Sequence, residues 1–173
     1  MFYSGGMATA PIDTASACAD PAKAAICAAD VARGTCRLFY RHDLFAIAEV
    51  PLANGRRADL MAIDAKGGIT IVEIKVSRAD LLGDLKWRDY LDYCDRFFWA
   101  VPPGFDLSPF ETEAFLPGLA GLIVADRYDG AILRDAATVA MPPARRRAET
   151  LRFARRAAHR WMAGIDPELG GFA

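Results

Sequence analysis

Two charged residues, Glu73 and Lys75, interrupt an otherwise apolar stretch of the chain, Ile69-Thr70-Ile71-Val72-Glu73-Ile74-Lys75-Val76. Side chains alternate between the two faces of a strand, so both charges share one face while the valine and isoleucine side chains around them occupy the other. Burying a carboxylate without a partner costs several kcal/mol, so Glu73 requires a cation from the protein or from a metal ion. The competing interpretation is a strand whose charged face is solvated.

A second carboxylate, Asp59, belongs to the preceding apolar stretch and can lie beside Glu73 across a sheet. Two carboxylates and the main-chain carbonyl of Ile74 are what Mg²⁺ needs if it is to keep several waters and bind phosphate oxygens, with Mn²⁺ as the alternative ion. Lys75 points at the same place, where it can position or deprotonate a water and stabilise charge on a pentavalent phosphate. We therefore expect Asp59, Glu73 and Ile74 to hold the metal and Lys75 to be catalytic.

The segments that position these residues begin with a helix and three strands. Asp20 and Pro21 fit the N-cap and first position of a helix that continues to about Leu38, with Gly34 as its weak point. Asn-Gly and Gly-Gly signals then mark hairpin turns, which predicts an antiparallel meander. Its third strand is β-branched enough to lie in the centre of the sheet. The three strands are expected over 44–50, 57–64 and 69–76.

The rest of the chain supplies a second helix, further strands and a long last helix. A helix over 79–95 would place acidic residues and Arg88 on one face and aromatic residues on the other. A strand over 97–101 ends at Pro102-Pro103-Gly104. A hairpin of 121–126 with 131–133 and a helix over 144–162 complete the order. This order predicts an α/β domain with a mixed central sheet.

Composition limits the class of protein. The chain has 173 residues, 53% of them hydrophobic, and a net charge of -1, which is typical of one globular domain and excludes disordered, fibrous and disulfide-held small proteins. We expect a loose arm over 1–19 and a single domain over 20–173. No apolar run is long enough for a membrane span, and the first residues lack the features of an export signal, so we expect a cytoplasmic protein. The four cysteines lack metal-binding spacing and are expected to be free thiols.

The order of elements and the charged pair resemble the PD-(D/E)XK nuclease superfamily. That superfamily has an αβββαβ core, an Asp on the second strand and Glu-x-Lys on the third, which correspond to Asp59 and Glu73-Ile74-Lys75 over residues 22–101. Ala58 stands where the superfamily name has Pro, at a position that varies and does not contact metal. The resemblance implies a metal-dependent nuclease with a restriction-endonuclease-like core.

The same resemblance suggests further site residues. An additional acid near the start of the core corresponds to Glu49, with Asp30 on the first helix as the competing choice. Nuclease sites of this kind frequently place a Lys, Gln or Tyr of the second helix against phosphate or water, and Lys86 and Tyr90 match that description. A lysine that extends its stem beside core tyrosines is the alternative explanation for Lys86.

Longer motifs resemble the MmcB-like family of bacterial DNA repair proteins. They are Gly55-Arg56-Arg57-Ala58-Asp59, Val72-Glu73-Ile74-Lys75-Val76-Ser77-Arg78-Ala79-Asp80, Asp84-Leu85-Lys86-Trp87-Arg88-Asp89-Tyr90 and Tyr93-Cys94-Asp95-Arg96-Phe97-Phe98-Trp99-Ala100-Val101-Pro102. Together they cover about half of the chain. The resemblance implies a role in DNA damage repair, with DNA and other repair proteins as partners.

Charge is distributed unevenly along the chain. Residues 1–140 carry 14 basic and 19 acidic side chains, whereas 141–160 carry seven arginines against Glu149 alone. Such a basic helix can contact the phosphates of DNA, which positions the nucleic acid without reading its bases. The expected DNA contacts are Arg57, Lys86, Tyr90, Arg145, Arg152 and Arg156. A solvated helix face and an acidic protein partner are the alternatives.

These observations favour a Mg²⁺-dependent deoxyribonuclease that hydrolyses phosphodiester bonds in DNA repair, with Asp59, Glu73, Lys75 and Glu49 in the active site. The alternative is a DNA-binding repair accessory that keeps a nuclease-like fold without turnover, because fold and motif alone do not establish activity. The sequence does not set the oligomeric state or the structure of the DNA substrate.

Overall fold

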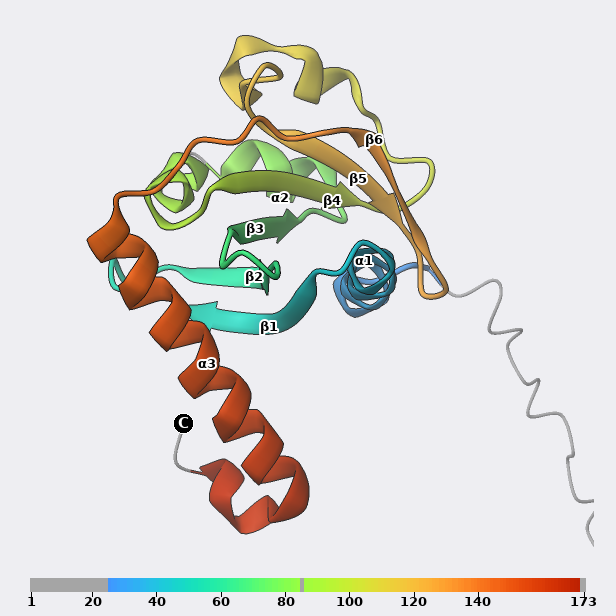
Figure 1. Cartoon of the computed structure of the whole chain (residues 1–173). Coiled ribbons are helices and arrows are strands. Elements are labelled where there is room, and N and C mark those ends of the chain that lie inside the picture. Colours follow the sequence, from blue (N-terminus) through green and yellow to red (C-terminus); the bar gives the residue numbers. More distant parts are fainter. Residues whose placement is uncertain (1–24, 85, 172–173) are drawn as a thin grey trace, which may run out of the picture.

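A six-stranded mixed sheet forms the centre of the molecule (Figure 1). The structure is a computed structural model, and it describes residues 25–84 and 86–171. The strands lie in sequence order: β1–β2, β2–β3 and β5–β6 are antiparallel, and β3–β4 and β4–β5 are parallel. Their bounds are β1 Phe45–Pro51, β2 Arg57–Ile63, β3 Ile69–Ile74, β4 Arg96–Val101, β5 Gly121–Ala125 and β6 Gly130–Arg134. The expected mixed α/β fold is confirmed.

The central place of β3 follows from its composition. All six of its residues are buried, and most of them are β-branched, which suits a strand that is covered on both faces. The meander of β1, β2 and β3 is confirmed, and Gly55 and Gly67 take the positive φ that its two turns require, +80° and +79°. The sequence pattern therefore predicted both the strands and their pairing in this half of the sheet.

Helices cover the two faces of the sheet. Helix α1 packs through Val31, Leu38 and Phe39 onto one apolar cluster, and the other face carries a second cluster that includes Trp87, Trp99 and residues of the later 3₁₀ turns. The helical elements are α1 Ala28–Arg41, α2 Arg78–Gly83, α3 Pro143–Ile165 and the 3₁₀ helices η1 Trp87–Tyr93, η2 Ser108–Glu111, η3 Glu113–Phe115 and η4 Pro167–Gly171. No helix in the described part of the chain is long and apolar enough to cross a membrane.

The first helix begins later than its sequence suggested. Helix α1 starts at Ala28, where the N-cap Cys27 and Asp30 form a capping box. The expected cap at Asp20 and Pro21, and the arm over 1–19, lie outside the described residues, so the division into arm and domain stays a prediction. Gly34 is not simply a weak point, because a Cβ there would lie 2.1 Å from the carbonyl oxygen of Asp126. The residue lets α1 approach the turn between β5 and β6 closely.

The single helix expected over 79–95 is wrong. Helix α2 ends at Gly83, Asp84 leaves helical geometry with φ -86° and ψ 72°, and the chain resumes as the 3₁₀ helix η1. Residues three apart are eclipsed on a 3₁₀ helix, so Trp87, Tyr90 and Tyr93 all reach the core. Glycine has low helix propensity, which allows the break at Gly83. The change of helix type rotates every later side chain relative to the expected faces.

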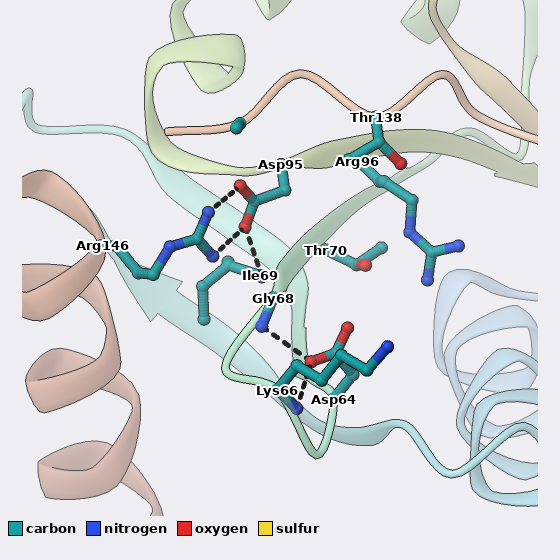
Figure 2. Close-up of a pocket in the computed structure, with 10 residues that line it drawn as sticks. Asp64, Lys66, Gly68, Ile69, Thr70, Asp95, Arg96, Thr138 and Arg146 are labelled. Carbon is teal, nitrogen blue, oxygen red and sulfur yellow. Dashed lines mark hydrogen bonds and ion pairs between the residues drawn. The ribbon is translucent and has the colours of Figure 1, made fainter. Parts of the chain in front are cut away.

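Helix α3 is attached to the sheet by a buried ion pair (Figure 2). Arg146 donates from both terminal nitrogens to Asp95, at 2.6 and 2.5 Å, and Asp95 also accepts the main-chain N–H groups of Ile69 and Met141 at 2.8 and 3.0 Å. Asp95 was expected on an exposed acidic face of the second helix, and that expectation is wrong. From this anchor α3 runs past the edge strand β1 and away from the sheet (Figure 1).

Candidate active site

A polar cavity of about 650 Å³ opens where β2 and β3 meet the segment around α2. It brings together the four residues that the sequence singled out for catalysis, Glu49, Asp59, Glu73 and Lys75, although they come from three different strands or strand ends. The same cavity is lined by Ile74, Arg57 and Tyr90 and by Ala28, Arg56, Ala79, Asp80, Gly83 and Asp84. The alternation along the strands was thus sufficient to bring these side chains to one place.

The two central carboxylates meet because β2 and β3 stop pairing just before them. The paired residues end at Leu60 and Val72, and beyond that point Asp59 accepts the main-chain N–H of Ile74 at 2.7 Å. A side chain therefore takes the place of a sheet carbonyl, and it holds the two strand ends together around the cavity. One oxygen of Asp59 is used in this way, and the carboxylate keeps further lone pairs for another partner.

Glu73 is the most unusual acid of the cavity. Its residue is only 4% exposed, and its Oε2 atom lies 3.7 Å from the Lys75 ammonium. Its Oε1 atom has no hydrogen-bond partner among residues 25–84 and 86–171. Burial, and next the charge of Asp59, raise the pKa of Glu73 to about 8, although the charge of Lys75 and a hydrogen bond with the Tyr90 side chain act in the opposite direction. A buried acceptor without a partner is rare in folded proteins and requires an explanation.

Asp59 experiences the same surroundings to a smaller degree. Burial raises its pKa, and the nearby Glu49 carboxylate adds to that effect, while the Ile74 N–H, Lys75 and Arg57 oppose it. The two neighbouring acids therefore resist being ionised together when no other cation is present.

Lys75 is buried and surrounded by acids. Its ammonium lies 2.9 Å from Asp84 and 3.8 Å from Asp80, in addition to its contact with Glu73. Burial alone would lower its pKa, but the hydrogen bond and charge of Asp84, with the charges of Glu73 and Asp80, raise it. Lys75 is therefore held as a cation at neutral pH, which suits it to stabilise negative charge rather than to accept a proton.

The sequence interpretation missed Asp84 and Asp80 as parts of this site. Both were assigned to the exposed face of a regular helix, but the break after Gly83 turns Asp84 toward Lys75. The signal that could have revealed them is Gly83 itself, immediately before an acid in a segment that otherwise reads as helical.

Of the two candidates for the auxiliary acid, Glu49 lines the cavity and Asp30 does not. Glu49 lines the cavity, takes an unusual positive φ of 54° near the end of β1 and forms an ion pair with Arg57. Asp30 instead caps α1 at Cys27 and lies 3.4 Å from Arg127. The backbone of Glu49 is in a region that side chains seldom adopt, and such geometry is concentrated at functional sites.

Tyr90 lines the cavity, and Lys86 does not. The Tyr90 hydroxyl donates to the main-chain oxygen of Arg57 at 3.1 Å, and burial together with the charge of Glu73 raises its pKa. Lys86 is exposed at the start of η1. The expected approach of Lys86 to the site is wrong. It was extrapolated from one continuous helix, whereas η1 has a different period from α2.

The arginines of α3 lie beside the cavity rather than in it. Arg152 donates to Glu149 at 2.9 Å and to the main-chain oxygen of Pro51 at 3.2 Å, and Pro51 pairs with Arg57 of the cavity wall. Arg145 lies 4.6 Å from the centre of the Tyr93 ring, and the buried Nε of Arg156 has no hydrogen-bond partner in the described part of the chain. Helix α3 thus reaches the cavity wall through Arg152, where β1 ends and β2 begins.

The ionic balance of the cavity leaves two carboxylates poorly neutralised. Arg57 pairs with Glu49, Arg56 with Asp89 outside the cavity, and Lys75 most closely with Asp84. Asp59 and Glu73 remain, one with a main-chain N–H and the other with an unpartnered oxygen. Within residues 25–84 and 86–171, no group of three or more His, Cys, Asp or Glu side chains is arranged to hold a metal ion. Two carboxylates are nevertheless a set that fits Mg²⁺, which keeps several waters.

The chain matches the model of a known protein family and resembles a solved structure. The family model described as DNA repair protein MmcB-like matches residues 15–168. Among solved structures, the SPO1766 protein of unknown function from Silicibacter pomeroyi is 40% identical and superposes with a TM-score of 0.75, over 82% of this chain and 92% of the other. No curated protein matches the chain.

Proposed function

The chain belongs to the MmcB-like family of DNA repair proteins, and from that premise we propose that it is a metal-dependent DNA nuclease with a PD-(D/E)XK-type active site. The observation that carries the proposal is the partnerless Oε1 atom of buried Glu73 beside the second carboxylate, Asp59. A purely structural acid in such a place would be saturated with hydrogen bonds. An acid that binds a ligand would keep an oxygen without a hydrogen bond until the ligand is bound.

The metal would be Mg²⁺ or Mn²⁺, held by Asp59 and Glu73 with the main-chain carbonyl of Ile74. When bound, it supplies a Lewis acid for the phosphate and an activated water. The raised pKa values of both carboxyl groups support this assignment, because a divalent cation would neutralise the charges that repel each other there.

The protein's own groups divide the remaining work. Lys75, kept protonated by Asp84, faces the site at which negative charge develops on the phosphate and stabilises that charge. Asp84 and Asp80 position the ammonium. Glu49 and Arg57, paired at the edge of the cavity, orient the phosphate backbone, with the arginine as the phosphate contact. Tyr90 fixes the Arg57 main chain from the other side.

DNA would approach along α3. Arg152 reaches the cavity wall at Pro51, and with Arg145 and Arg156 of the same helix it offers sequence-independent contacts to phosphates, so binding should weaken steeply with salt. Contacts to phosphates carry no information about the bases, and we propose that selectivity is for DNA structure rather than for base sequence.

The test is cleavage of labelled single-stranded, duplex, flap and junction DNA with Mg²⁺ or Mn²⁺, with the Lys75→Ala variant prepared in parallel. We expect cleavage of at least one substrate by the wild type, a loss of about 10²- to 10³-fold in Lys75→Ala, and no cleavage in EDTA. Lys66→Ala is the matched control, because Lys66 is exposed at a turn and does not line the cavity.

Absence of cleavage on every substrate, with no Mg²⁺ or Mn²⁺ binding by calorimetry, would reject the nuclease. Tight and salt-sensitive DNA binding in the same experiment would then assign the protein as a non-catalytic repair accessory. Metal-dependent cleavage that persists in Lys75→Ala would reject the assigned role of the lysine but not the metal site.

A further inference from the structure

The outward face of α3 carries an apolar stripe that the fold leaves uncovered. Four large side chains on this helix are exposed: Leu151 (60%), Trp161 (72%), Met162 (52%) and Ile165 (68%). With the exposed Ala154 and Ala158 they recur at three- and four-residue spacing, so they share one side of the helix. Contiguous exposed apolar surface of this kind marks an interaction site.

The other side of α3 already contacts the body. Arg146 is bonded to Asp95, Glu149 is buried, and Phe153 packs against the core cluster. The stripe therefore points away from the sheet, and the second half of the helix projects past β1 (Figure 1). Within the described residues, its solvent-facing side has no covering segment.

The distribution of large and small side chains along the stripe suits contact with a second copy of the same helix. We propose that α3 packs antiparallel against α3 of a second copy of the chain, about a two-fold axis at Ala158. Residues equally far from Ala158 on either side then meet across the axis. Leu151 meets Ile165 of the second copy, and the small Ala154 receives the large Met162. Small residues at the centre and large ones opposite small ones allow two helices to approach closely.

Charge favours the same arrangement. Arg147 and Arg155 lie on or beside the first half of the stripe, whereas Asp166 and Glu168 are exposed just beyond its far end. Antiparallel packing brings the basic half of one helix to the acidic end of the other, and a parallel arrangement would bring like charges together. DNA suits the stripe less well, because its surface is apolar and ends in carboxylates. A second copy is therefore the occupant that the surface fits.

The first experiment measures mass against concentration by sedimentation equilibrium. A contact made by one pair of helices is small, so we expect a dimer with a dissociation constant in the micromolar range. Ala158→Arg places two like charges on the axis and should weaken dimerisation at least tenfold. Leu133→Arg, which changes another exposed apolar residue on β6, is the matched control and should dimerise like the wild type.

The second experiment tests the axis directly. Facing Cα atoms of two helices packed 8–10 Å apart lie about 4–5 Å from each other, which is within reach of a disulfide. Ala158→Cys should therefore form a covalent dimer on mild oxidation, whereas wild type and Ala144→Cys, at the far end of the helix, should not. This readout remains valid if Ala158→Arg lowers stability.

A wild type that stays monomeric at the highest attainable concentration would overturn the proposal, as would a dimer that Ala158→Arg does not weaken. A monomer whose DNA affinity falls on Trp161→Ala would assign the stripe to DNA instead. The proposal does not depend on the nuclease, and Asp59→Ala should dimerise unchanged, so failure of one proposal is distinguishable from failure of the other.

Discussion

At the start of β3 the main-chain N–H of Ile69 donates to Asp95, and at its end the N–H of Ile74 donates to Asp59, which lies beside Glu73. At each end of β3, a carboxylate from another segment thus accepts a main-chain N–H group of the strand. Asp95 also accepts from Arg146 (Figure 2) and from the main-chain N–H of Met141, so that both of its oxygens are bonded. Glu73 is equally buried and leaves one oxygen without a partner.

The pKa values of the two acids move in opposite directions. Burial alone would raise the pKa of Asp95, but the hydrogen bonds from Arg146, Ile69 and Met141 lower it overall. Burial raises the pKa of Glu73 to about 8, because its cation is shared with Asp84 and a second carboxylate is adjacent. A saturated acid stabilises the fold, whereas an unsaturated acid keeps capacity for a ligand that the chain does not contain.

The largest expected effect is on Glu73. Glu73→Gln removes a metal ligand, and the several kcal/mol of transition-state stabilisation that a metal supplies correspond to a loss of about 10³-fold in cleavage rate. The folded protein should be as stable as the wild type or more so, because a buried carboxyl with a raised pKa is removed. Initial cleavage rates and thermal unfolding measure the two effects. Unfolded Glu73→Gln would instead show that this acid stabilises the fold.

Asp95→Asn should lower the stability of the fold and leave the cleavage rate unchanged. Removing one partner of a buried ion pair leaves Arg146 without its carboxylate, and we expect the free energy of unfolding to fall by about 3 kcal/mol. Urea denaturation measures this loss. The cleavage rate per folded molecule should not change, since Asp95 does not line the cavity. If Asp95→Asn abolished cleavage without loss of stability, the distinction between the two acids would be wrong.

In the metal-free protein, Glu73 and Asp95 should contribute opposite pH dependences to stability. Glu73 has a folded pKa of about 8, against an ordinary value of 4.5. Between these two pH values the folded state binds more protons than the unfolded state. The free energy of unfolding therefore falls as pH rises from 4.5 to 8, by at most about 1.4 kcal/mol per pH unit. The folded pKa of Asp95 is depressed, so its contribution is complete above the unfolded value of about 3.9 and is lost as pH falls through the folded pKa.

Denaturation curves from pH 5 to 9 in EDTA measure this contrast. Glu73→Gln should remove the decline, and Asp95→Asn should lower the whole curve without changing its slope. A wild-type curve that is flat over this range would contradict the assigned environment of Glu73.

The smallest effect is expected at Asp84. Asp84→Asn weakens the 2.9 Å contact that holds the Lys75 ammonium, and loss of such a positioning partner typically costs about tenfold in activity. Asp92→Asn is the matched control, because Asp92 is exposed on η1. Equal activity of the two variants would show that Lys75 is positioned without Asp84.

The accuracy of the sequence interpretation depended on the type of element. On the strands, the two-residue alternation and the turn signals placed Asp59, Glu73 and Lys75 around one cavity, because register in a meander follows from short turns and one buried face. On the second helix, extrapolation of the 3.6-residue period failed. It placed Lys86 toward the site and Asp84 and Asp95 in solvent, since a single break at Gly83 changes the direction of every later side chain.

The pairing of β1, β2 and β3, the buried position of β3 and the gathering of carboxylates at its end were thus determined by the sequence itself, through patterns whose physical causes lie within a few residues. Which of the buried acids is neutralised was decided only by the tertiary structure. Arg146 reaches Asp95 from α3, 51 residues away, whereas no cation among the described residues reaches the Oε1 atom of Glu73. Such partners depend on how distant segments pack, and local sequence patterns do not contain that information.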